Sequence, residues 1–258
     1  RDRSVSRGLG DVYKRQVRNM PGALQFTEDT MGRYLGNQRI RTGLLVNWQL
    51  LPEVELSPAG YPLMQPVDMP ADDSATLARF KDALTCEFPQ SQGLQFFQDD
   101  YQFERVWAQP EKYLEVVARF KFTLQTNFSL YSDYPRPLNQ WNHFRNQLLG
   151  AWWQARGLTV VPVAAWGDPE DDVYAFDGIP TDSCIAISTW GFCKSAELRQ
   201  RFLRGLGAFL DAKKPTGILF YGKVSPEVAN LCAGIPAREY PSTIGSARFN
   251  ACLLYTSD

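Results

Sequence analysis

The stretches Cys184-Ile185-Ala186-Ile187 and Ile218-Leu219-Phe220 decide the fold class of this chain. Each is an unbroken apolar run, which predicts a strand buried on both faces, as in a parallel sheet covered by helices. Residues 195–212, between the two runs, have helical periodicity, with Ser195 as the candidate N-cap. The region therefore predicts a strand–helix–strand unit.

Similar short runs recur along most of the chain. The candidate strands are 62–67, 94–98, 120–126, 158–163, 183–188, 216–221 and 237–241. They start 21 to 38 residues apart, which agrees with a βαβ unit of roughly 30 residues. These repeated units predict an α/β fold with a parallel, TIM-barrel-like sheet, complete or partial. A doubly wound open sheet is the alternative, because one sequence does not fix strand order.

A second long helix is predicted over residues 137–156, before a glycine at 157. Its expected apolar stripe consists of Leu138, Trp141, Leu148 and Trp152. A stripe at this spacing predicts that one face packs on the sheet.

The composition excludes several classes of protein. Of 258 residues, 44% are hydrophobic and 21% charged, which is typical of a globular chain. No apolar run approaches the ~20 residues of a membrane-spanning helix. The formal net charge of −1 gives no electrostatic reason to expect binding to nucleic acid or to anionic membranes.

One DNA element explains both ends of the chain. Residues 11–16 back-translate to GATGTGTATAAGAGACAG. The reverse complement of this DNA encodes Cys-Leu-Leu-Tyr-Thr, as at 252–256, and the forward strand read in a shifted frame, AGA GAC AG, gives Arg-Asp-Arg, as at 1–3. We therefore interpret 1–16 and 252–258 as translated sequencing adaptor from a metagenomic fragment. The expected organisation is an irregular segment at 17–59 and a single α/β domain at 60–251. Residues 17–251 carry 22 basic and 25 acidic side chains, a net charge of −3.

Four cysteines remain outside the two end segments: Cys86, Cys184, Cys193 and Cys232. They have no Cys-x-x-Cys spacing and no histidine at ligand distance in sequence, which argues against zinc. We expect reduced, mostly buried thiols in a cytoplasmic protein.

Polar residues follow the predicted strands at their carboxyl ends, where both architectures place their active sites. They are Asp99, Asp100, Asn127, Ser129, Asp133, Trp166, Asp168, Ser188, Thr189, Tyr221 and Lys223. Two carboxylates in such a site can divide acid and base roles when their environments separate their pKa values. Asp99, Asp100, Asp133 and Asp168 are therefore the candidate catalytic residues, and the substrate would be small and polar.

Several of these candidates also have a structural interpretation. Asp100 could cap the helix that starts near Tyr101, and Asp168 lies in a Gly-Asp-Pro turn signature. Ser188 and Thr189 could cap a turn, and Trp166 could belong to the core. The lone helical histidine, at 143, and the cysteine at 193 are weak candidates for catalysis, because neither has a visible partner.

No cofactor motif is evident. The chain lacks the P-loop, the Gly-x-Gly-x-x-Gly fingerprint, His-Glu-x-x-His and Gly-x-Ser-x-Gly. Asp99, Asp100 and Asp168 could gather around Mg²⁺ or Mn²⁺, which prefer oxygen ligands.

Several blocks of this sequence resemble one family, domain of unknown function 4417, found in prokaryotes and their phages. The blocks are FQDDYQFERVW (97–107), NFSLYSD (127–133), WNHFR (141–145), GAWWQ (150–154), WGD (166–168), FDGIP (176–180), IST (187–189) and YG (221–222). The resemblance covers about residues 60–243 in the same order. Asn127 stands where the family has Asp, which puts in doubt any mechanism that needs an acid there.

The resemblance singles out further residues as candidates for substrate binding. Glu104, Arg105, Asn142 and Arg145 join Asn127, Ser129, Trp166, Ser188 and Tyr221 in that set. Glu104 and Arg145 could instead form a buried ion pair that fixes helix register.

Two functions fit these observations. The first is a hydrolase for a sugar- or nucleotide-like substrate, with Asp99 and Asp100 as acid and base and an arginine for an anionic group. The second is a non-catalytic accessory module of a phage or mobile element that binds a host protein or nucleic acid. In its nucleic-acid version, contacts would come from His143, Trp152, Trp153, Arg145 and Arg156. The tryptophans could equally be core, and the acidic balance makes nucleic acid the less favoured partner.

Overall fold

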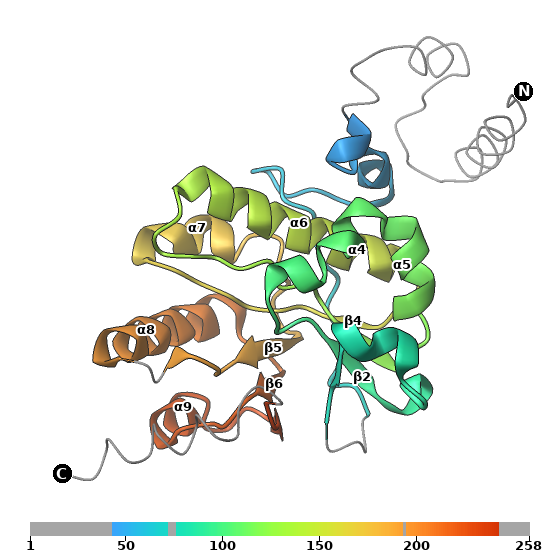
Figure 1. Cartoon of the computed structure of the whole chain (residues 1–258). Helices are drawn as coiled ribbons and strands as arrows, with labels where there is room; N and C mark the ends of the chain where they lie inside the picture. Colours follow the sequence, from blue (N-terminus) through green and yellow to red (C-terminus); the bar gives the residue numbers. More distant parts are fainter. Residues whose placement is uncertain (1–42, 72–75, 193–194, 243–258) are drawn as a thin grey trace, which may run out of the picture. The chain divides into compact units, whose positions relative to one another are not determined.

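The computed structural model describes residues 43–71, 76–192 and 195–242 (Figure 1). The chain divides into two compact units, Arg1–Glu53 and Val54–Asp258. The described part of the first unit contains the 3₁₀ helix η1 (Trp48–Glu53), in which Leu50 is buried. All elements named below belong to the second unit.

The second unit is built on short parallel strands. They are β1 (Ala78–Arg79), β2 (Gly93–Gln95), β3 (Phe122–Leu124), β4 (Val160–Val161), β5 (Cys184–Ser188), β6 (Gly217–Tyr221) and β7 (Ala237–Tyr240). They form a four-stranded sheet in the order β1-β2-β3-β4 and a three-stranded sheet in the order β5-β6-β7. Every pairing is parallel.

Helices alternate with these strands. They are η2 (Phe80–Thr85), η3 (Pro89–Ser91), η4 (Asp100–Gln102), α4 (Glu104–Ala108), α5 (Pro110–Val117), α6 (Arg136–Ala155), η5 (Pro169–Asp171), α7 (Asp172–Ala175), α8 (Ala196–Lys213) and α9 (Pro226–Leu231). The predicted α/β class with parallel sheets is thus confirmed. Within the described ranges, no helix combines the length and apolar character needed to cross a membrane.

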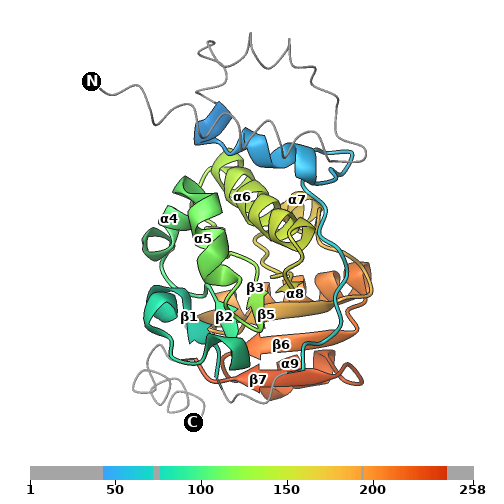
Figure 2. The same ribbon diagram turned by 90° about the vertical axis from the view of Figure 1, so that its right-hand side faces the viewer.

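The two sheets meet between β4 and β5. Val163 and Ala186 form an isolated parallel bridge, and the Ala186 N–H donates to the Pro162 carbonyl at 2.8 Å. Figure 2 shows the strands in an arc that runs from β1 and β2 through β3 and β5 to β6 and β7. Neither sheet has the reversal of strand order that a doubly wound sheet requires. The described strands form no closed barrel, because β1 and β7 are not paired.

The strands β5 and β6 are buried on both faces, as their unbroken apolar runs predict. Cys184, Ala186, Leu219 and Tyr221 belong to a cluster that also contains Phe97, Phe122, Leu124 and Val161 near the other sheet. Ile185, Ile187, Ile218 and Phe220 belong to a second cluster, with Leu206 and Phe209 of α8. Alternate residues of each strand therefore serve different layers.

The predicted helix over 195–212 is present as α8. The Ser195 hydroxyl accepts a hydrogen bond from the Leu198 N–H at 3.2 Å, which is the predicted N-cap. After Lys213 the chain leaves the helix through Lys214, whose backbone is left-handed.

The prediction of a strand at 62–67 was wrong. Within it, Pro62 forms only an isolated antiparallel bridge with Leu56, and the first strand is β1 instead. Prolines at 62 and 66 have no N–H to donate to a sheet, so this segment cannot form a regular ladder.

The predicted apolar stripe of the helix at 137–156 was partly wrong. Leu138 is 50% exposed, whereas Leu148 and Trp152 are buried in α6. The amino-terminal half of the buried face carries polar side chains instead: Asn139, Asn142, His143, Arg145, Asn146 and Gln147.

Two glycines of α8 offer a matched test of its packing. A Cβ at position 205 would overlap the Trp166 indole, whereas a Cβ at 207 meets nothing within 4 Å. We expect Gly205→Ala to lower the free energy of unfolding by about 1–3 kcal/mol through overpacking. Gly207→Ala should raise it by about 0.5–1 kcal/mol through helix propensity. Urea unfolding of both variants checks this, and equal effects would contradict the close packing of Trp166 on α8.

Candidate functional site

The loops that follow β2, β3 and β4 lie at the carboxyl ends of the strands, where the sequence predicts the site. Asp100 connects the first two loops. Its carboxylate accepts hydrogen bonds from the Ser129 hydroxyl at 2.9 Å and from the Ser129 N–H at 3.1 Å. Burial raises the pKa of Asp100, and the bonds from Ser129 and the nearby Arg145 offset part of this rise.

The helix-capping interpretation of Asp100 was wrong. Asp99 holds the N-cap position of η4, and its side chain makes no capping hydrogen bond. The Asp100 carboxylate reaches the loop after β3 instead. A local pattern could not predict this contact, because its partner is 29 residues away in sequence.

Three asparagines of α6 hold the loop after β3. Asn146 accepts from the Phe128 N–H at 2.8 Å and donates to the Phe128 carbonyl at 3.0 Å. Asn139 makes the same pair of bonds with Tyr131, at 3.0 and 2.8 Å. Asn142 donates to the Ser129 carbonyl between them, at 2.7 Å. We call these three residues the asparagine ladder.

Sequence reasoning identified Asn142 and missed the other two residues of the ladder. The sequence does contain a pattern that indicates the ladder. The asparagines at 139, 142 and 146 are spaced three and four residues apart, so they share one face of the helix. Side-chain amides can both accept from and donate to a peptide group, so this face can replace a neighbouring strand as hydrogen-bond partner.

Arg145 ties the ladder to α4. Its guanidinium donates to both carboxylate oxygens of Glu104 at 2.9 Å and to the Asn142 Oδ1 at 2.6 Å. It also lies 3.7 Å from the centre of the Phe128 ring. The ion pair that the sequence suggested as the alternative to substrate binding is therefore present, but only Arg145 is buried and Glu104 is half-exposed.

Asp168 and Trp166 belong to a different set of contacts. The Asp168 carboxylate lies 3.3 Å from the Arg201 Nε of α8, and its carbonyl accepts from the Asp171 N–H in a turn. Trp166 packs against Phe202 and Phe209. Both residues thus have the structural roles that the sequence left open.

The other predicted site residues are dispersed. Asp99 accepts a hydrogen bond from the Gln102 amide, and Ser188 accepts one from the Trp190 N–H. Arg105 lies over the rings of Phe80 and Tyr113.

The candidates on and after β5 and β6 contact each other or the core. Tyr221 is buried and stacks on Phe97, with 5.0 Å between the ring centres, and Thr189 donates to the Tyr221 carbonyl at 3.4 Å. Asn127, after β3, is half-buried. Asp133 and Lys223 are exposed. The network around Asp100 therefore contains Ser129, Asn142, Arg145 and Glu104, and not the other candidate acids.

The proposed metal ligands are not brought together either. Among the described residues, no group of three or more His, Cys, Asp or Glu side chains could hold a metal ion. Asp168 is paired with Arg201, and the oxygens of Asp100 are occupied by Ser129.

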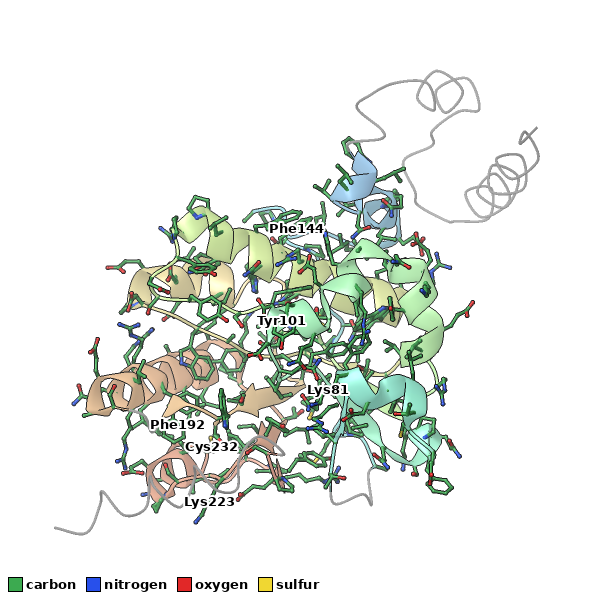
Figure 3. All side chains as sticks on the ribbon, viewed as in Figure 1. Lys81, Tyr101, Phe144, Phe192, Lys223 and Cys232 are labelled. Atoms are coloured by element: carbon green, nitrogen blue, oxygen red, sulfur yellow. The ribbon has the colours of Figure 1, made fainter. Side chains whose placement is uncertain are left out.

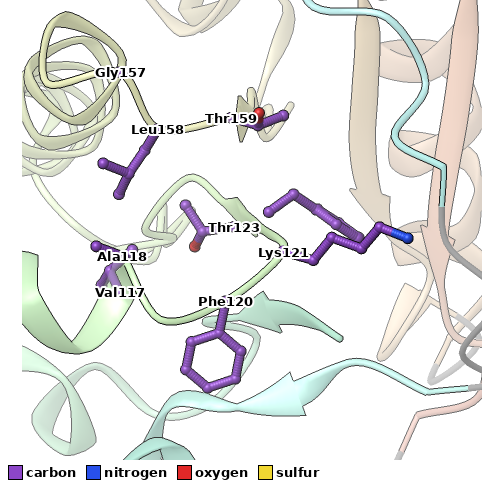
Figure 4. A pocket seen from close by; sticks show the side chains of 9 residues that line it. Val117, Ala118, Phe120, Lys121, Thr123, Gly157, Leu158 and Thr159 are labelled. Carbon is purple, nitrogen blue, oxygen red and sulfur yellow. The ribbon is translucent and has the colours of Figure 1, made fainter. Parts of the chain in front are cut away.

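A small cleft of about 190 Å³ lies at the opposite, amino ends of β3 and β4 (Figure 4). Lys121 and Thr123 line it from β3 and its approach, and Gly157, Leu158 and Thr159 line it from the segment before β4. None of the predicted site residues lines it.

The remaining candidates are structural. Trp152 and Trp153 are 1% and 0% exposed, so the prediction that they stack on nucleic acid was wrong. Cys86, Cys184 and Cys232 are free thiols, and burial raises the pKa of Cys184 to about 12 and that of Cys232 to about 11. Cys193 lies outside the described residues, as do both interpreted adaptor segments.

His143 is buried between aromatic rings. Its Nε2 lies 2.9 Å from the Asp177 carbonyl, and its ring meets those of Tyr61 and Tyr174 edge-on. A carbonyl can only accept, so Nε2 carries the proton. Burial lowers the pKa of His143 to about 4.

These features define an α/β protein with parallel sheets and a hydrogen-bonded polar network at its strand ends. Residues 56–240 match the model of the family Domain of unknown function (DUF4417). The chain belongs to this family.

Two phage proteins are similar to parts of the chain. The "Gene 1 protein" of Mycobacterium phage D29 is 41% identical over 131 residues, which are 51% of this chain and 48% of that protein. The "Gene 1 protein" of Mycobacterium phage L5 is 36% identical over 156 residues, which are 58% of this chain and 64% of that protein. The chain thus spans about half to just under two thirds of these relatives. No solved structure matches.

The buried histidine predicts a pH dependence of stability. Between its ordinary pKa of 6.5 and its folded value of about 4, the unfolded chain takes up a proton that the folded chain does not. Stability from this group is therefore complete above pH 6.5 and is lost as the pH falls, by up to roughly 3 kcal/mol at pH 4. Urea unfolding between pH 7 and 5 should show a smaller slope for His143→Gln than for the unmodified chain. Parallel profiles would contradict the buried, neutral imidazole.

Proposed function

We propose that this chain is an accessory protein of a phage or a related mobile element that binds a protein partner through the loops after β2 and β3. The observation that carries the proposal is the exposure of aromatic side chains there. Tyr101 is 78% exposed, Tyr131 44% and Tyr134 45%. Figure 3 marks Tyr101 on the segment before α4. We call Asp99, Tyr101, Tyr131, Asp133 and Tyr134 the tyrosine surface.

Hydrogen bonds join the two loops that carry the tyrosine surface. The Gln102 amide contacts both the Asp99 carboxylate, at 3.3 Å, and the Tyr101 hydroxyl, at 3.4 Å. The bonds from Asp100 to Ser129 join this loop to the next one. There, the rings of Tyr131 and Tyr134 lie 4.8 Å apart on either side of Asp133 in sequence.

Part of the surface is held in place by bonds within the chain. Asn139 binds the Tyr131 backbone through two hydrogen bonds, and Arg145 and Glu104 join α6 to α4. A fixed loop loses little conformational entropy on binding. Tyrosine is enriched at interfaces because it contributes a large contact area with few rotatable bonds.

The family supports the phage part of this proposal, since two relatives are phage proteins. A phage accessory protein of this kind would act in the cytoplasm of the host. Nucleic acid is the less favoured partner, because phosphates require basic side chains and the tyrosine surface carries carboxylates.

Removal of the three tyrosines tests the proposal. We expect Tyr101→Ser/Tyr131→Ser/Tyr134→Ser to lose, by at least about tenfold, a protein that the unmodified chain retains from a mycobacterial lysate, because interface tyrosines often contribute about 2 kcal/mol each. Quantitative pull-down with mass spectrometry measures this.

The matched control is Phe88→Ser. This side chain is 60% exposed but lies in the connection before β2, at the amino ends of the strands. It should retain the same protein. If the triple variant binds as well as the unmodified chain, the partner does not use the tyrosine surface.

A hydrolase for a small polar substrate is the second candidate function, supported by the raised pKa and half-burial of Asp100. This candidate would suit an incomplete TIM-barrel-like sheet formed by the seven sequential parallel strands, because barrel enzymes have their active sites at the carboxyl ends of the strands. Protonated Asp100 would donate to the leaving-group oxygen, and the exposed Asp99 would activate a water molecule.

Turnover of nitrophenyl glycosides and nitrophenyl phosphate esters tests the second candidate. Asp100→Asn should lower any measured turnover by about 10²–10⁴-fold, because general acid catalysis contributes that much. Asp211→Asn, at an exposed position of α8, is the control and should leave turnover unchanged. Activity that survives in Asp100→Asn would exclude this acid, and no turnover by the unmodified chain would exclude the hydrolase for these substrates.

A further inference from the structure

We infer that the partner of the tyrosine surface presents arginine side chains to it. The inference rests on the proposed function and specifies the chemistry of the partner. It follows from which charges around the surface are already paired within the chain and which are not.

The arginines near the carboxyl ends of the strands are paired internally. Arg136 pairs with Asp171, Arg145 with Glu104, Arg199 with Glu227, Arg201 with Asp168, and Arg204 with Asp172. Each of these cations thus already has an acidic partner within the chain.

The carboxylates of the tyrosine surface are in the opposite situation. Asp99 and Asp133 are exposed, and neither forms an ion pair with any residue in the described ranges. The surface therefore presents uncompensated negative charge beside aromatic rings. Both features would stabilise a bound cationic partner, because carboxylates attract a cation and the face of an aromatic ring forms cation–π contacts with it.

The residue types of the tyrosine surface favour arginine over lysine. The ring centres of Tyr131 and Tyr134 lie 4.8 Å apart with their planes tilted by 51°, and Asp133 lies between the two residues in sequence. A planar guanidinium can stack on a ring while it forms two parallel bonds to a carboxylate, and an ammonium cannot. The chain contains a related contact, since Arg145 lies over the Phe128 ring while one of its guanidinium nitrogens donates to both oxygens of Glu104.

The one exposed arginine on the neighbouring helix is directed elsewhere. The Arg105 guanidinium of α4 lies 5.1 Å from the Phe80 ring centre and 5.7 Å from that of Tyr113. These rings belong to η2 and α5, not to the tyrosine surface. Arg105 therefore does not supply the missing counter-charge.

Synthetic peptides of alternating arginine and serine test the inference, with lysine–serine and glutamate–serine peptides of equal length as controls. Fluorescence anisotropy with the whole chain should show binding of the arginine peptide, weaker binding of the lysine peptide and none of the glutamate peptide. Affinity should fall as salt rises from about 50 to about 200 mM, because exposed charges are screened.

Two double variants locate the binding. Asp99→Asn/Asp133→Asn should weaken the arginine peptide by about tenfold or more, since the attraction is largely electrostatic. Tyr131→Ser/Tyr134→Ser should remove the preference for arginine over lysine. Asp211→Asn/Asp182→Asn removes two exposed carboxylates elsewhere and should leave binding unchanged.

The outcomes separate the inference from the proposed function. If the triple tyrosine variant loses its protein partner while the arginine peptide fails to bind, the docking surface stands and the arginine inference is overturned. The same holds if the Asp99→Asn/Asp133→Asn variant binds the peptide as tightly as the unmodified chain. If the triple tyrosine variant keeps both its partner and the peptide, both proposals are overturned.

Discussion

The backbone of the loop after β3 must find hydrogen-bond partners where no further strand is available, and the asparagine ladder provides them. An unsatisfied buried peptide group costs about 1–3 kcal/mol, so several such groups would outweigh most of the stability of a domain. Asn146 and Asn139 satisfy both polar groups of Phe128 and of Tyr131. The polar face of α6 is therefore a structural requirement of the chain's exit from β3.

The ladder also determines what the acidic residues nearby can do. Asn142 holds the Ser129 carbonyl, while the Ser129 N–H and hydroxyl donate to Asp100, so the carboxylate of Asp100 is bound to the loop after β3. Arg145 takes its position from Asn142 and Phe128 and pairs with Glu104. Residues that looked like a catalytic set in the sequence thus connect the loops after β2 and β3.

The parts of the fold that could be predicted from sequence depend on local patterns. The apolar runs at 184–187 and 218–220 and the Ser195 cap all carry their signal within one element. The prediction of a strand at 62–67 was wrong because its prolines remove backbone N–H donors from an otherwise apolar stretch. The site could not be derived in the same way, because Asp100 and Ser129 are 29 residues apart and Glu104 and Arg145 are 41 apart. Only the tertiary fold decides whether a carboxylate caps, pairs or stays exposed.

The distribution of charge then separates structural from functional candidates. A carboxylate with an internal cation, such as Asp168 with Arg201 or Asp172 with Arg204, is already accounted for by the fold. Asp99 and Asp133 lack such a cation within the described part of the chain, and so do the exposed rings beside them. The exposed tyrosines contribute little to the core, and the proposed binding surface would give them a role outside the fold. The unpaired carboxylates would then favour a partner of positive charge.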